Sequence, residues 1–485
     1  MAGSVGSSSD HKRIASFSLL VILALLSLSA CRAFGSHVVK FLPGYRGQLP
    51  FHLETGYVSV DDSELFYYFI ESQGNPSQDP IFLWLTGGPG CSAFNGLIYE
   101  IGPMQFDIHN YPGGPPSLLP LEDAWTKTAS IIFVDLPAGS GFSYSRTQAG
   151  WPSSDTLAAE QAFQFLVKWL LEHPKYLPLE LFISGDSYTG MFIPVVTKKV
   201  LERNIAGAVP SFNLKGYLIG SPTTDEALNS NSKIVFAHRM ALISDELYER
   251  LKVSCNKSYI NVEPSNAECT EALQAYNLCV QGVGKGDILE PNCAFVSPRN
   301  PENGDAALPR RFLQKISGNS LLVGSPDRNL QLERCRTYNY TLAPIWANDP
   351  RVIEALHVRK GTVRRWVRCN QSLSYTKDVE SVIPVHKYLT RHDLNVLIQT
   401  GDRDMVVPHV ATRAWVQELG LAVDSNWRPW FVGGQVAGYT EEYDSDASGY
   451  RLVYATVKGA GHPAPEYYRK ECYQMFDRWV HTYPL

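Results

Sequence analysis

The sequence is short of several features that would each indicate a class of function. Its net charge is only −5 over 485 residues, which argues against nucleic acid as a partner. Neither a His-Glu-x-x-His motif nor a Cys-x-x-Cys pair occurs, so the sequence predicts no metal and indicates no cofactor. No internal repeat is visible. What remains is a chain with 44% apolar residues, enough for one large core or two domains.

Long apolar runs are also missing, with one exception near the N-terminus. His11, Lys12 and Arg13 precede an apolar run over residues 17–30, and small residues follow up to Ser36. This order is typical of a secretory signal peptide, and the run is shorter than the ~20 residues that a membrane span needs. An uncleaved signal anchor is the alternative. We therefore expect a signal peptide over 1–35, no stable membrane span, and a secretory-pathway protein of the vacuole or the cell exterior.

Nine cysteines are present, and Cys31 would leave with the signal peptide. In an oxidising compartment the others predict disulfides, although spacing alone does not fix their connectivity. They are Cys91, Cys255, Cys269, Cys279, Cys293, Cys335, Cys369 and Cys472. Three Asn-x-Ser/Thr triplets, at Asn256, Asn339 and Asn370, are candidate glycosylation sites.

Strands and helices alternate along most of the chain. Candidate strands cover 64–71, 80–86, 129–136 and 214–220, and an amphipathic helix covers 155–173 with Asp155 or Thr156 as its cap. Such alternation indicates a mostly parallel central sheet with helices on both faces. The expected fold class is α/β.

The alternation stops between about residues 225 and 341, where Cys, Gly, Pro and Asn dominate. We interpret 36–485 as one domain and 225–341 as a disulfide-stapled insertion that forms a cap over the C-terminal edge of the sheet. Within it, 297–329 predicts a flexible segment that is open to proteolytic excision; a long surface loop is the simpler alternative.

Ser187 lies in a sharp turn between a predicted strand, 181–184, and a predicted helix, 191–203. A serine placed in this way beside a glycine is typical of the nucleophile elbow of α/β-hydrolases, where the helix N-terminus favours a developing oxyanion. The usual pattern has Gly two residues after the serine, but here Thr189 stands there and Gly190 follows. Because the motif often arises by chance, the hypothesis depends on a base and an acid downstream.

An aspartate and a histidine follow in the order that this fold requires. Asp404 lies in a turn after an apolar strand over 395–399, and His462 lies in a turn after a second strand over 452–457. Asp402 is the alternative acid. We prefer Asp404 because the fourth residue of a Gly-x-x-Asp turn usually points at the histidine in this fold, whereas Asp402 would cap the turn through backbone N–H groups.

A glycine run, Gly87-Gly88-Pro-Gly90, follows another predicted strand. No Gly-Lys-Ser/Thr follows it, so it is not a phosphate-binding P-loop. In an α/β-hydrolase the loop after an early strand supplies an N–H group to the oxyanion hole, and glycine lets the backbone approach the reacting carbonyl. We therefore predict that the N–H groups of Gly88 and Tyr188 form this hole.

Two charged clusters have simpler explanations than ligand binding. One surrounds Trp366 and predicts a solvated basic face; it comprises Arg359, Lys360, Arg364, Arg365 and Arg368. The other lacks the spacing of a calcium loop and predicts an exposed hairpin; it comprises Glu441, Glu442, Asp444 and Asp446.

Over residues 37–485 the chain resembles the serine carboxypeptidase family. The resemblance rests on Gly-Gly-Pro-Gly-Cys (87–91), Val-Asp-Leu-Pro-Ala-Gly-Ser-Gly-Phe-Ser-Tyr (134–144), Gly-Asp-Ser-Tyr-Thr-Gly (185–190), Gly-Asp-Arg-Asp (401–404) and Gly-Ala-Gly-His (459–462). It implies the α/β-hydrolase fold, with Ser187, Asp404 and His462 as nucleophile, acid and base. It also implies a Cys91–Cys335 disulfide. For the cap we suggest the short-range pairs Cys255–Cys269 and Cys279–Cys293.

Two departures from the family pattern bear on the substrate. Family peptidases have Asn before Gly-Gly and Glu before the serine, and they bind the peptide C-terminal carboxylate with these residues and a second acid. The matching positions here are Thr86, Asp186 and Glu100, with Gly87 beside them. Thr lacks the amide of Asn, and Asp reaches ~1.5 Å less far than Glu. We therefore expect peptides to bind poorly.

Thr-Gly-Gly together with Gly-Asp-Ser-Tyr resembles the plant serine carboxypeptidase-like acyltransferases, many of which have Ser at the position of Thr189. The resemblance implies transfer of an acyl group from a glucose ester to an acceptor alcohol, so the partners would be small molecules. A serine carboxypeptidase is the alternative, favoured by Glu100. A catalytically idle binding protein is a third possibility, against which the intact triad argues. The acyl group, the acceptor and the oligomeric state are not indicated.

Overall fold

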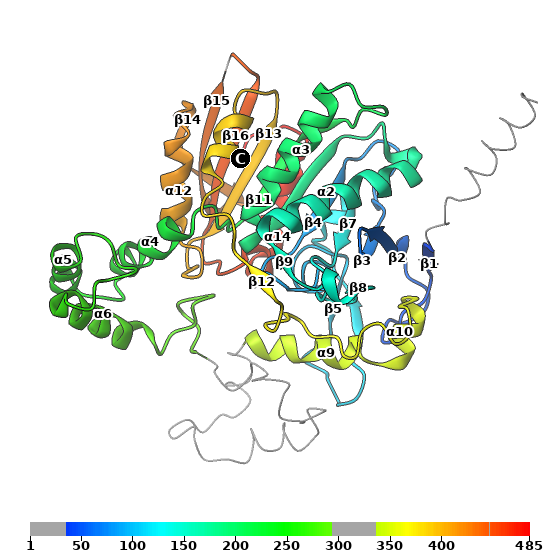
Figure 1. Cartoon of the computed structure of the whole chain (residues 1–485), viewed down its shortest axis with the longest axis horizontal. Coiled ribbons are helices and arrows are strands. Elements are labelled where there is room, and N and C mark those ends of the chain that lie inside the picture. The colour runs from blue at the N-terminus through cyan, green and yellow to red at the C-terminus, as the bar shows by residue number, and fades with distance from the viewer. Residues whose placement is uncertain (1–34, 293–335, 446) are drawn as a thin grey trace, which may run out of the picture. The chain divides into compact units, whose positions relative to one another are not determined.

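A mixed sheet forms the centre of the computed structural model, which describes residues 35–292, 336–445 and 447–485 (Figure 1). The predicted excisable segment 297–329 and all but the last residue of the predicted signal peptide lie outside these residues. Across the sheet the order is β1 (His37–Val39), β2 (Leu53–Val60), β3 (Ser63–Ile70), β7 (Ser130–Val134), β4 (Ile81–Leu85), β10 (Leu181–Asp186), β11 (Leu214–Gly220), β13 (Asn395–Gly401), β16 (Tyr450–Val457), β15 (Gln435–Ser445) and β14 (Ala422–Val432), with β8 (Tyr144–Ser145) beside β3.

The central strands, from β7 to β16, pair in parallel, and antiparallel strands complete both edges. Two small ladders lie apart from this sheet; they are β5 (Met104–Phe106) with β6 (Leu118–Pro120), and β9 (Ser153–Ser154) with β12 (Tyr375–Thr376). Parallel strands bring their carboxyl ends to one edge of a sheet, which is where catalytic side chains of open α/β folds gather.

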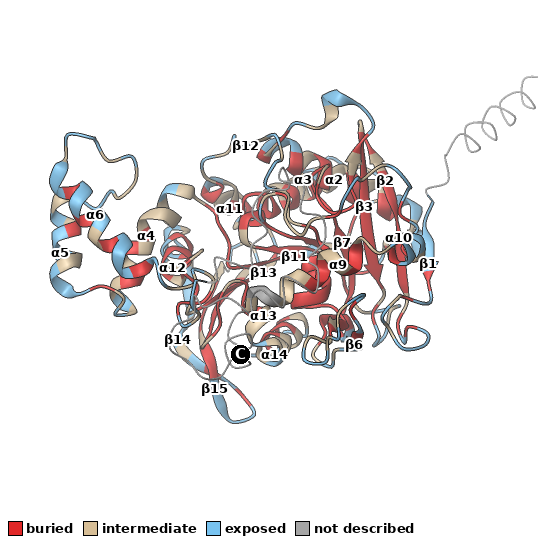
Figure 2. Cartoon of the chain, turned by 90° about the horizontal axis from the view of Figure 1, so that it is seen from below, coloured by how far each residue is buried: buried red, intermediate tan, exposed pale blue. Residues whose placement is uncertain are grey.

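Helices cover both faces of the sheet (Figures 1 and 2). Outside the insertion they are α2 (Asp155–Glu172), α3 (Ile193–Ile205), α9 (Leu342–Ala347), α10 (Pro350–Ala355), α11 (Ile383–Leu389), α12 (His409–Glu418), α13 (Ala464–Tyr467) and α14 (Arg469–Val480). Short helical turns include η1 (Gly96–Glu100), η5 (Ser187–Met191) and η7 (Arg336–Thr341). This architecture confirms the predicted α/β-hydrolase fold.

Burial of the sheet on both faces explains the uninterrupted apolar runs of its central strands. Every residue of β4, Ile-Phe-Leu-Trp-Leu, is buried. On one face Phe82 stacks on Phe182 of β10 with ring centroids 4.8 Å apart, and Phe476 of α14 packs edge-on at 5.2 Å. The buried positions of α14 follow helical spacing and are Cys472, Met475, Phe476 and Trp479.

The cap of helix α2 differs from its prediction. Ser154 is the N-cap, and its hydroxyl accepts a hydrogen bond from the Leu157 N–H at 3.2 Å. Asp155 is free of this role and is buried, because tertiary partners described below occupy its carboxylate.

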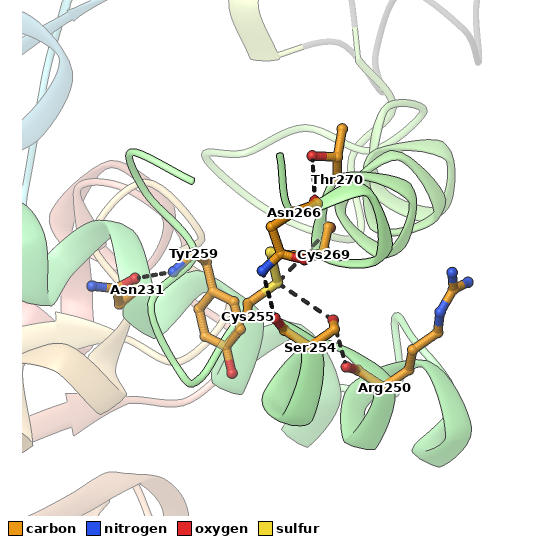
Figure 3. Close-up of a disulfide and its surroundings, with 8 residues drawn as sticks. All are labelled: Asn231, Arg250, Ser254, Cys255, Tyr259, Asn266, Cys269 and Thr270. Atoms are coloured by element: carbon orange, nitrogen blue, oxygen red, sulfur yellow. Dashed lines mark hydrogen bonds between the residues drawn. A yellow bond between two sulfur atoms is a disulfide. The ribbon is translucent and has the colours of Figure 1, made fainter. Parts of the chain in front are cut away.

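The first part of the insertion folds into α4 (Glu226–Arg239), α5 (Asp245–Ser254) and α6 (Ala267–Val280), of which α5 and α6 lie beyond α4, outside the sheet (Figures 1 and 2). A disulfide joins Cys255, at the end of α5, to Cys269 in α6 (Figure 3). Cys279 is exposed, and its suggested partner Cys293 lies outside the described residues. The apolar cluster of this insertion continues into the sheet domain through Met405 and Val410. Its function as a cap stays a prediction.

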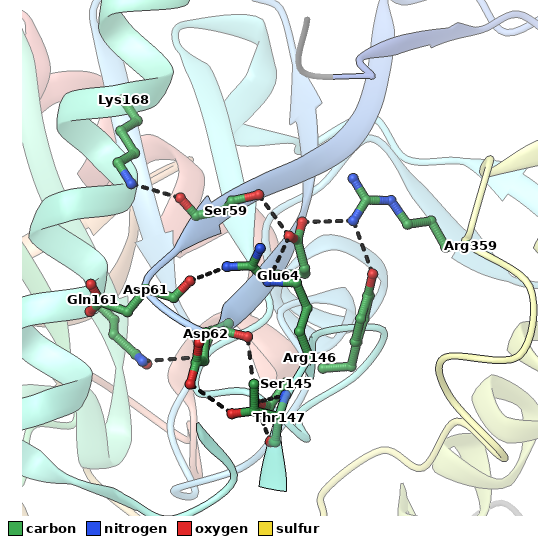
Figure 4. A network of polar contacts seen from close by, with 12 residues as sticks. Ser59, Asp61, Asp62, Glu64, Ser145, Arg146, Thr147, Gln161, Lys168 and Arg359 are labelled. Carbon is green, nitrogen blue, oxygen red and sulfur yellow. Dashed lines mark hydrogen bonds and ion pairs between the residues drawn. The ribbon is translucent and has the colours of Figure 1, made fainter. Parts of the chain in front are cut away.

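The basic cluster is only in part a solvated face. Arg359 donates to Glu64 of β3 at 2.7 Å and to the Tyr144 hydroxyl at 3.0 Å (Figure 4). Glu64 is buried and also accepts from Ser59 at 2.7 Å. The contact was not foreseeable because nearly 300 residues separate Arg359 from Glu64 along the chain.

The acidic cluster is not an exposed hairpin, so that prediction was wrong. Glu441 and Glu442 are buried within strand β15. Arg413 pairs with Glu441 at 3.2 Å, and Arg451 of the neighbouring strand pairs with Glu442 at 2.9 Å. These arginines explain how consecutive carboxylates tolerate burial.

His386 is a fully buried histidine that should make stability depend on pH. Its Nδ1 lies 2.8 Å from the Tyr217 hydroxyl, and its Nε2 has no hydrogen-bond partner among the described residues. Burial lowers the pKa of His386 to about 3. The unfolded chain therefore takes up this proton near pH 6.5, while the folded protein does not until about pH 3.

We expect this histidine to remove ~1.4 kcal/mol of unfolding free energy for each pH unit below about 6.5. His386→Gln keeps an acceptor for Tyr217 and removes the titration. Urea unfolding of both proteins between pH 7.5 and 4.5 checks the prediction, because the variant should show the flatter dependence by about one proton. Parallel curves would contradict it.

Candidate active site

Three sequence-predicted residues come together at the carboxyl edge of the sheet. Ser187 follows β10, Asp404 follows β13, and His462 follows β16. The Ser187 Oγ lies 2.8 Å from Nε2 of His462, and Nδ1 of His462 lies 2.7 Å from Oδ2 of Asp404. A serine, an imidazole and a buried carboxylate in this chain of contacts have the geometry of an activated nucleophile with its general base.

The turn at Ser187 is tight and strained. Ser187 has φ +60°, which is uncommon for a residue other than glycine and raises its hydroxyl above the strand end. A Cβ at Gly185 would lie 2.1 Å from the carbonyl oxygen of Leu85, and one at Gly190 would lie 2.3 Å from that of Thr223. Close backbone neighbours therefore require glycine at these two positions.

These contacts also account for the displaced glycine of the elbow motif. Thr189 stands where the usual pattern has Gly, and its hydroxyl donates to the Asp186 carbonyl at 2.7 Å. The backbone that follows strand β11 lies close to Gly190 instead, so a side chain at position 190 would collide with it. The position that must be glycine in this turn is therefore 190, one residue later than in the usual motif.

Asp404 is fixed rigidly, and Asp402 has a different function. Oδ1 of Asp404 accepts from the N–H groups of Val406 and Val407 at 2.8 and 2.9 Å, and none of its side chain is exposed. Asp402 accepts from the Gly459 N–H at 2.7 Å and pairs with Lys458 at 2.7 Å. Asp402 therefore joins the two turns, while Asp404 contacts the histidine.

A short segment of the insertion connects the acid turn to the base turn. The carbonyl oxygen of Lys285 accepts from the Met405 N–H at 2.9 Å, and that of Gly286 accepts from the His462 N–H at 2.8 Å. A Cβ at Gly461 would lie 2.2 Å from the Gly286 carbonyl oxygen. The insertion thus supports two of the three turns directly.

The glycine loop lies against the nucleophile turn. A Cβ at Gly87 would lie 2.6 Å from Cβ of Ser187 and 2.8 Å from the backbone nitrogen of Tyr188. Gly88 has φ +126°, a conformation that only glycine adopts readily. The two predicted oxyanion donors, Gly88 and Tyr188, are therefore in adjoining turns beside Ser187.

The disulfide beside this loop differs from the expected one. Cys91 is bonded to Cys369, not to Cys335, which lies outside the described residues. Residues 91 and 369 face each other in a short antiparallel bridge, where Asn370 donates to Gly90 at 2.9 Å. Because this bridge brings residues 91 and 369 face to face, Cys369 is the disulfide partner of Cys91. Cys472, also expected to be bonded, is buried and free.

The three positions that depart from or match the peptidase pattern are all buried, and the charge of Asp186 acts on the carboxyl group of Glu100. Thr86 is buried, and its hydroxyl accepts from the Trp84 indole N–H at 3.2 Å. Asp186 accepts from the Gly87 N–H. One carboxyl oxygen of Asp186 and one of Glu100 have no partner among the described residues.

Burial raises the pKa of Asp186 to about 6, and burial together with the negative charge of Asp186 raises the pKa of Glu100 well above its usual range. At mildly acidic pH the pair therefore holds at least one proton. A protonated carboxyl can donate a hydrogen bond, while its neighbour accepts one.

The electrostatics of His462 suit a general base in such surroundings. Burial alone would lower its pKa, but the charge and hydrogen bond of Asp404 outweigh burial, with smaller contributions from Asp186 and Glu466. The net effect raises the pKa of His462. Activity that requires the neutral imidazole should therefore rise with pH through this raised pKa.

Two acidic groups that were not predicted from the sequence adjoin the site. Asp155 accepts from the hydroxyls of Tyr188 and Tyr375, both at 2.8 Å, and thereby fixes the ring that follows the nucleophile. Nothing local in the sequence signals this contact. Glu466 accepts from the Tyr340 hydroxyl at 2.6 Å; its position only four residues after His462 in the sequence was a usable signal.

The candidate glycosylation sites differ in accessibility. Asn256 is exposed just after α5, whereas Asn339 and Asn370 are half-buried. The Asn370 amide donates to the Gly139 carbonyl at 3.0 Å. Asn256 is therefore the best placed of the three to carry a glycan.

The described residues lack two features that would indicate other functions. Over 35–292, 336–445 and 447–485, no helix combines the length and apolar character of a membrane span. In the same ranges, no group of three or more His, Cys, Asp or Glu side chains is arranged to hold a metal ion.

Comparison with known proteins gives one consistent family. The family model described as serine carboxypeptidase matches residues 43–482. Serine carboxypeptidase-like 17 of Arabidopsis thaliana is 41% identical over 475 residues, covering 97% of this chain and 98% of the relative. Serine carboxypeptidase-like 2 of the same plant is 40% identical over 471 residues, covering 96% and 98%.

Among solved structures, KEX1(delta)P, a prohormone-processing carboxypeptidase from Saccharomyces cerevisiae, superimposes with a TM-score of 0.67. It is 18% identical and covers 89% of this chain and 92% of its own. At this identity the likeness shows the shared fold.

Proposed function

The chain belongs to the serine carboxypeptidase family, and we propose that it transfers an acyl group from a glucose ester to an acceptor alcohol through an acyl-enzyme on Ser187. The observation that carries the proposal is the set of buried side chains near Ser187 that we propose as a pocket. It keeps a pair of buried carboxyl groups, from Asp186 and Glu100, but has Thr86 where an amide would help to hold a peptide carboxylate.

The chemistry of this pocket favours a sugar over a peptide terminus. The Thr86 hydroxyl is engaged by Trp84, and it replaces two amide N–H donors with at most one O–H. A carboxyl pair that shares a proton offers both a donor and an acceptor, which is what neighbouring sugar hydroxyls require. A carboxylate ligand would instead add a second negative charge to the one that such a pair carries.

The mechanism follows from the triad geometry. His462 takes the proton of Ser187, whose oxygen attacks the ester carbonyl, and the N–H groups of Gly88 and Tyr188 stabilise the oxyanion. His462 then gives the proton to the departing glucose oxygen. An acceptor alcohol attacks the acyl-enzyme with His462 as its base, and transfer exceeds hydrolysis only where water is excluded from the site.

Secretion to the vacuole or the cell exterior is part of the same proposal. Two disulfides among the described residues support an oxidising route. The raised pKa of Asp186, about 6, suits a mildly acidic compartment, because the carboxyl pair is then partly protonated.

The decisive experiment supplies the purified full-length protein with a galloyl or hydroxycinnamoyl glucose ester and a pool of alcohols. In a separate assay it supplies a blocked dipeptide. Mass spectrometry identifies the products, and Ser187→Ala is the control. Acyl-alcohol products that vanish in the variant support the proposal. Dipeptide cleavage without transfer would establish the carboxypeptidase alternative.

Restoring the peptidase pattern should change the preference between substrates. We expect Thr86→Asn combined with Asp186→Glu to raise kcat/KM for a blocked dipeptide by about tenfold, equivalent to ~1.4 kcal/mol from one regained amide contact and a longer carboxyl. Release of glucose from the ester should fall in the same variant. The ratio of the two activities is the measurement, and an unchanged ratio would contradict the assignment of this pocket.

A further inference from the structure

The side chain of Tyr188 is anchored, although only the backbone N–H of this residue is assigned a place in the reaction. Tyr188 is buried, and its hydroxyl donates to Oδ1 of Asp155 at 2.8 Å. Burial and the hydrogen bond to Asp155 raise the pKa of the Tyr188 hydroxyl. The hydroxyl therefore stays protonated and remains a donor at neutral and acidic pH.

Asp155 is itself a fixed point. It lies in the first turn of α2 and is only 1% exposed. Its Oδ1 also accepts from the Tyr375 hydroxyl at 2.8 Å, and its Oδ2 accepts from the Val379 N–H at 3.1 Å. None of the three donors belongs to α2, so this carboxylate joins the helix to the nucleophile turn and to residues 375–379.

The ring of Tyr188 is enclosed as well as anchored. Phe192 and Tyr375 pack edge-on against it, with ring centroids 5.6 and 6.3 Å away, and Nζ of Lys377 lies 5.0 Å from its centroid. A tyrosine side chain has only two rotatable bonds, so fixing both the ring and the hydroxyl also restricts the backbone from which the side chain extends.

The backbone at this place needs such support. Ser187 has φ +60°, and a strained residue of this kind persists only where its surroundings hold it. The next peptide N–H, that of Tyr188, is one of the two assigned oxyanion donors. One such donor contributes about 10²–10³-fold to kcat, provided that it points at the developing charge.

We propose that Asp155 is a positioning residue for the oxyanion hole, and that it aligns the Tyr188 N–H by holding the Tyr188 hydroxyl. The inference rests on the oxyanion donor assigned in the proposed function. It does not depend on the acceptor, because transfer to an alcohol and hydrolysis by water both pass through an oxyanion at Ser187.

The test uses a fluorophosphonate, which needs no knowledge of the natural acyl group. The Ser187 oxygen attacks phosphorus, fluoride leaves, His462 takes the proton, and the phosphoryl oxygen occupies the oxyanion hole. The dependence of labelling on reagent concentration separates the maximal rate constant, kinact, from the half-saturating concentration, KI. Tyr188→Phe removes the hydroxyl and keeps the ring.

Tyr375→Phe is the matched control, because it removes a hydrogen bond of the same length to the same oxygen of Asp155. Thermal unfolding of both variants measures the structural loss, which should be similar. We expect kinact to fall by about tenfold in Tyr188→Phe and by less than about threefold in Tyr375→Phe, with KI nearly unchanged in both.

A double-mutant cycle shows whether the hydroxyl acts through Asp155. Asp155→Asn should also lower kinact, and adding Tyr188→Phe to it should cause little further loss. Equal falls of kinact in the two tyrosine variants, a change confined to KI, or losses that multiply in the double variant would overturn the proposal. If Asp155→Asn does not fold, the two tyrosine variants still decide. A wild-type protein that is not labelled at Ser187 would instead overturn the nucleophile of the proposed function.

Discussion

Replacing Asp404 by Asn is expected to lower kcat by ~10⁴-fold without unfolding the protein. One oxygen of Asp404 accepts two backbone N–H groups and the other faces Nδ1 of His462. An amide can keep only the first set with its oxygen, so its NH₂ group would face Nδ1. The imidazole would then carry its proton on Nε2 and could not accept that of Ser187.

The same variant should also move the pH dependence. The negative charge of Asp404 is the main influence that raises the pKa of His462 against the effect of burial. Without it the acid limb of the residual kcat/KM should shift to lower pH. Profiles of glucose release between pH 4 and 8 test this, with thermal unfolding as the check on folding.

Asp402→Asn is the matched control, because Asp402 contacts Gly459 and Lys458 but not the histidine. Its activity should stay within a few-fold of wild type. If Asp402→Asn were the more damaging of the two, the assignment of the acid would be wrong.

Gly87→Ala should slow the reaction strongly, because its new methyl group meets the nucleophile turn itself. The new Cβ would lie 2.6 Å from Cβ of Ser187, 2.8 Å from N of Tyr188 and 3.0 Å from O of Asp186. None of these is the flexible end of a side chain, so either the glycine loop or the nucleophile turn must move. Displacements of this size cost ~10²-fold in rate where reacting groups must be aligned.

Gly282→Ala is the comparison, since a Cβ there meets nothing within 4 Å. Kinetics of glucose release, together with labelling of Ser187 by a fluorophosphonate, should show a slow Gly87→Ala protein and an unimpaired Gly282→Ala protein. Equal rates in the two variants would show that the loop does not need to touch the nucleophile turn.

The sequence predicted those parts of the fold that local patterns determine. The strand over 214–220 has the bounds that its apolar run indicated, and Ser187, Asp404 and His462 meet because parallel strands end at a common edge. Strand order and local turn chemistry were enough to choose Asp404 over Asp402.

Features that depend on contacts between distant segments were not predictable in this way. The partner of Cys91 is set by a bridge between backbones 278 residues apart, and no spacing rule encodes it. The sequence predicts Asp155 or Thr156 as a helix cap, and it does not reveal the partners of the Asp155 carboxylate, Tyr188 and Tyr375, because the latter is remote in sequence and neither contact is local. Local signals cannot separate a solvated acid from one whose partners arrive from elsewhere.

The segment around Gly286 has a consequence for the exchange of parts between relatives. The backbone carbonyls of this segment accept hydrogen bonds from the turn of the acid and the turn of the base. The insertion therefore helps to position the catalytic residues. A chimera that imports a foreign insertion should place its crossover before Lys285 and leave the native residues 285–288 in the host. A chimera that also replaces residues 285–288 would change substrate preference and the alignment of His462 at the same time, so the two effects could not be separated.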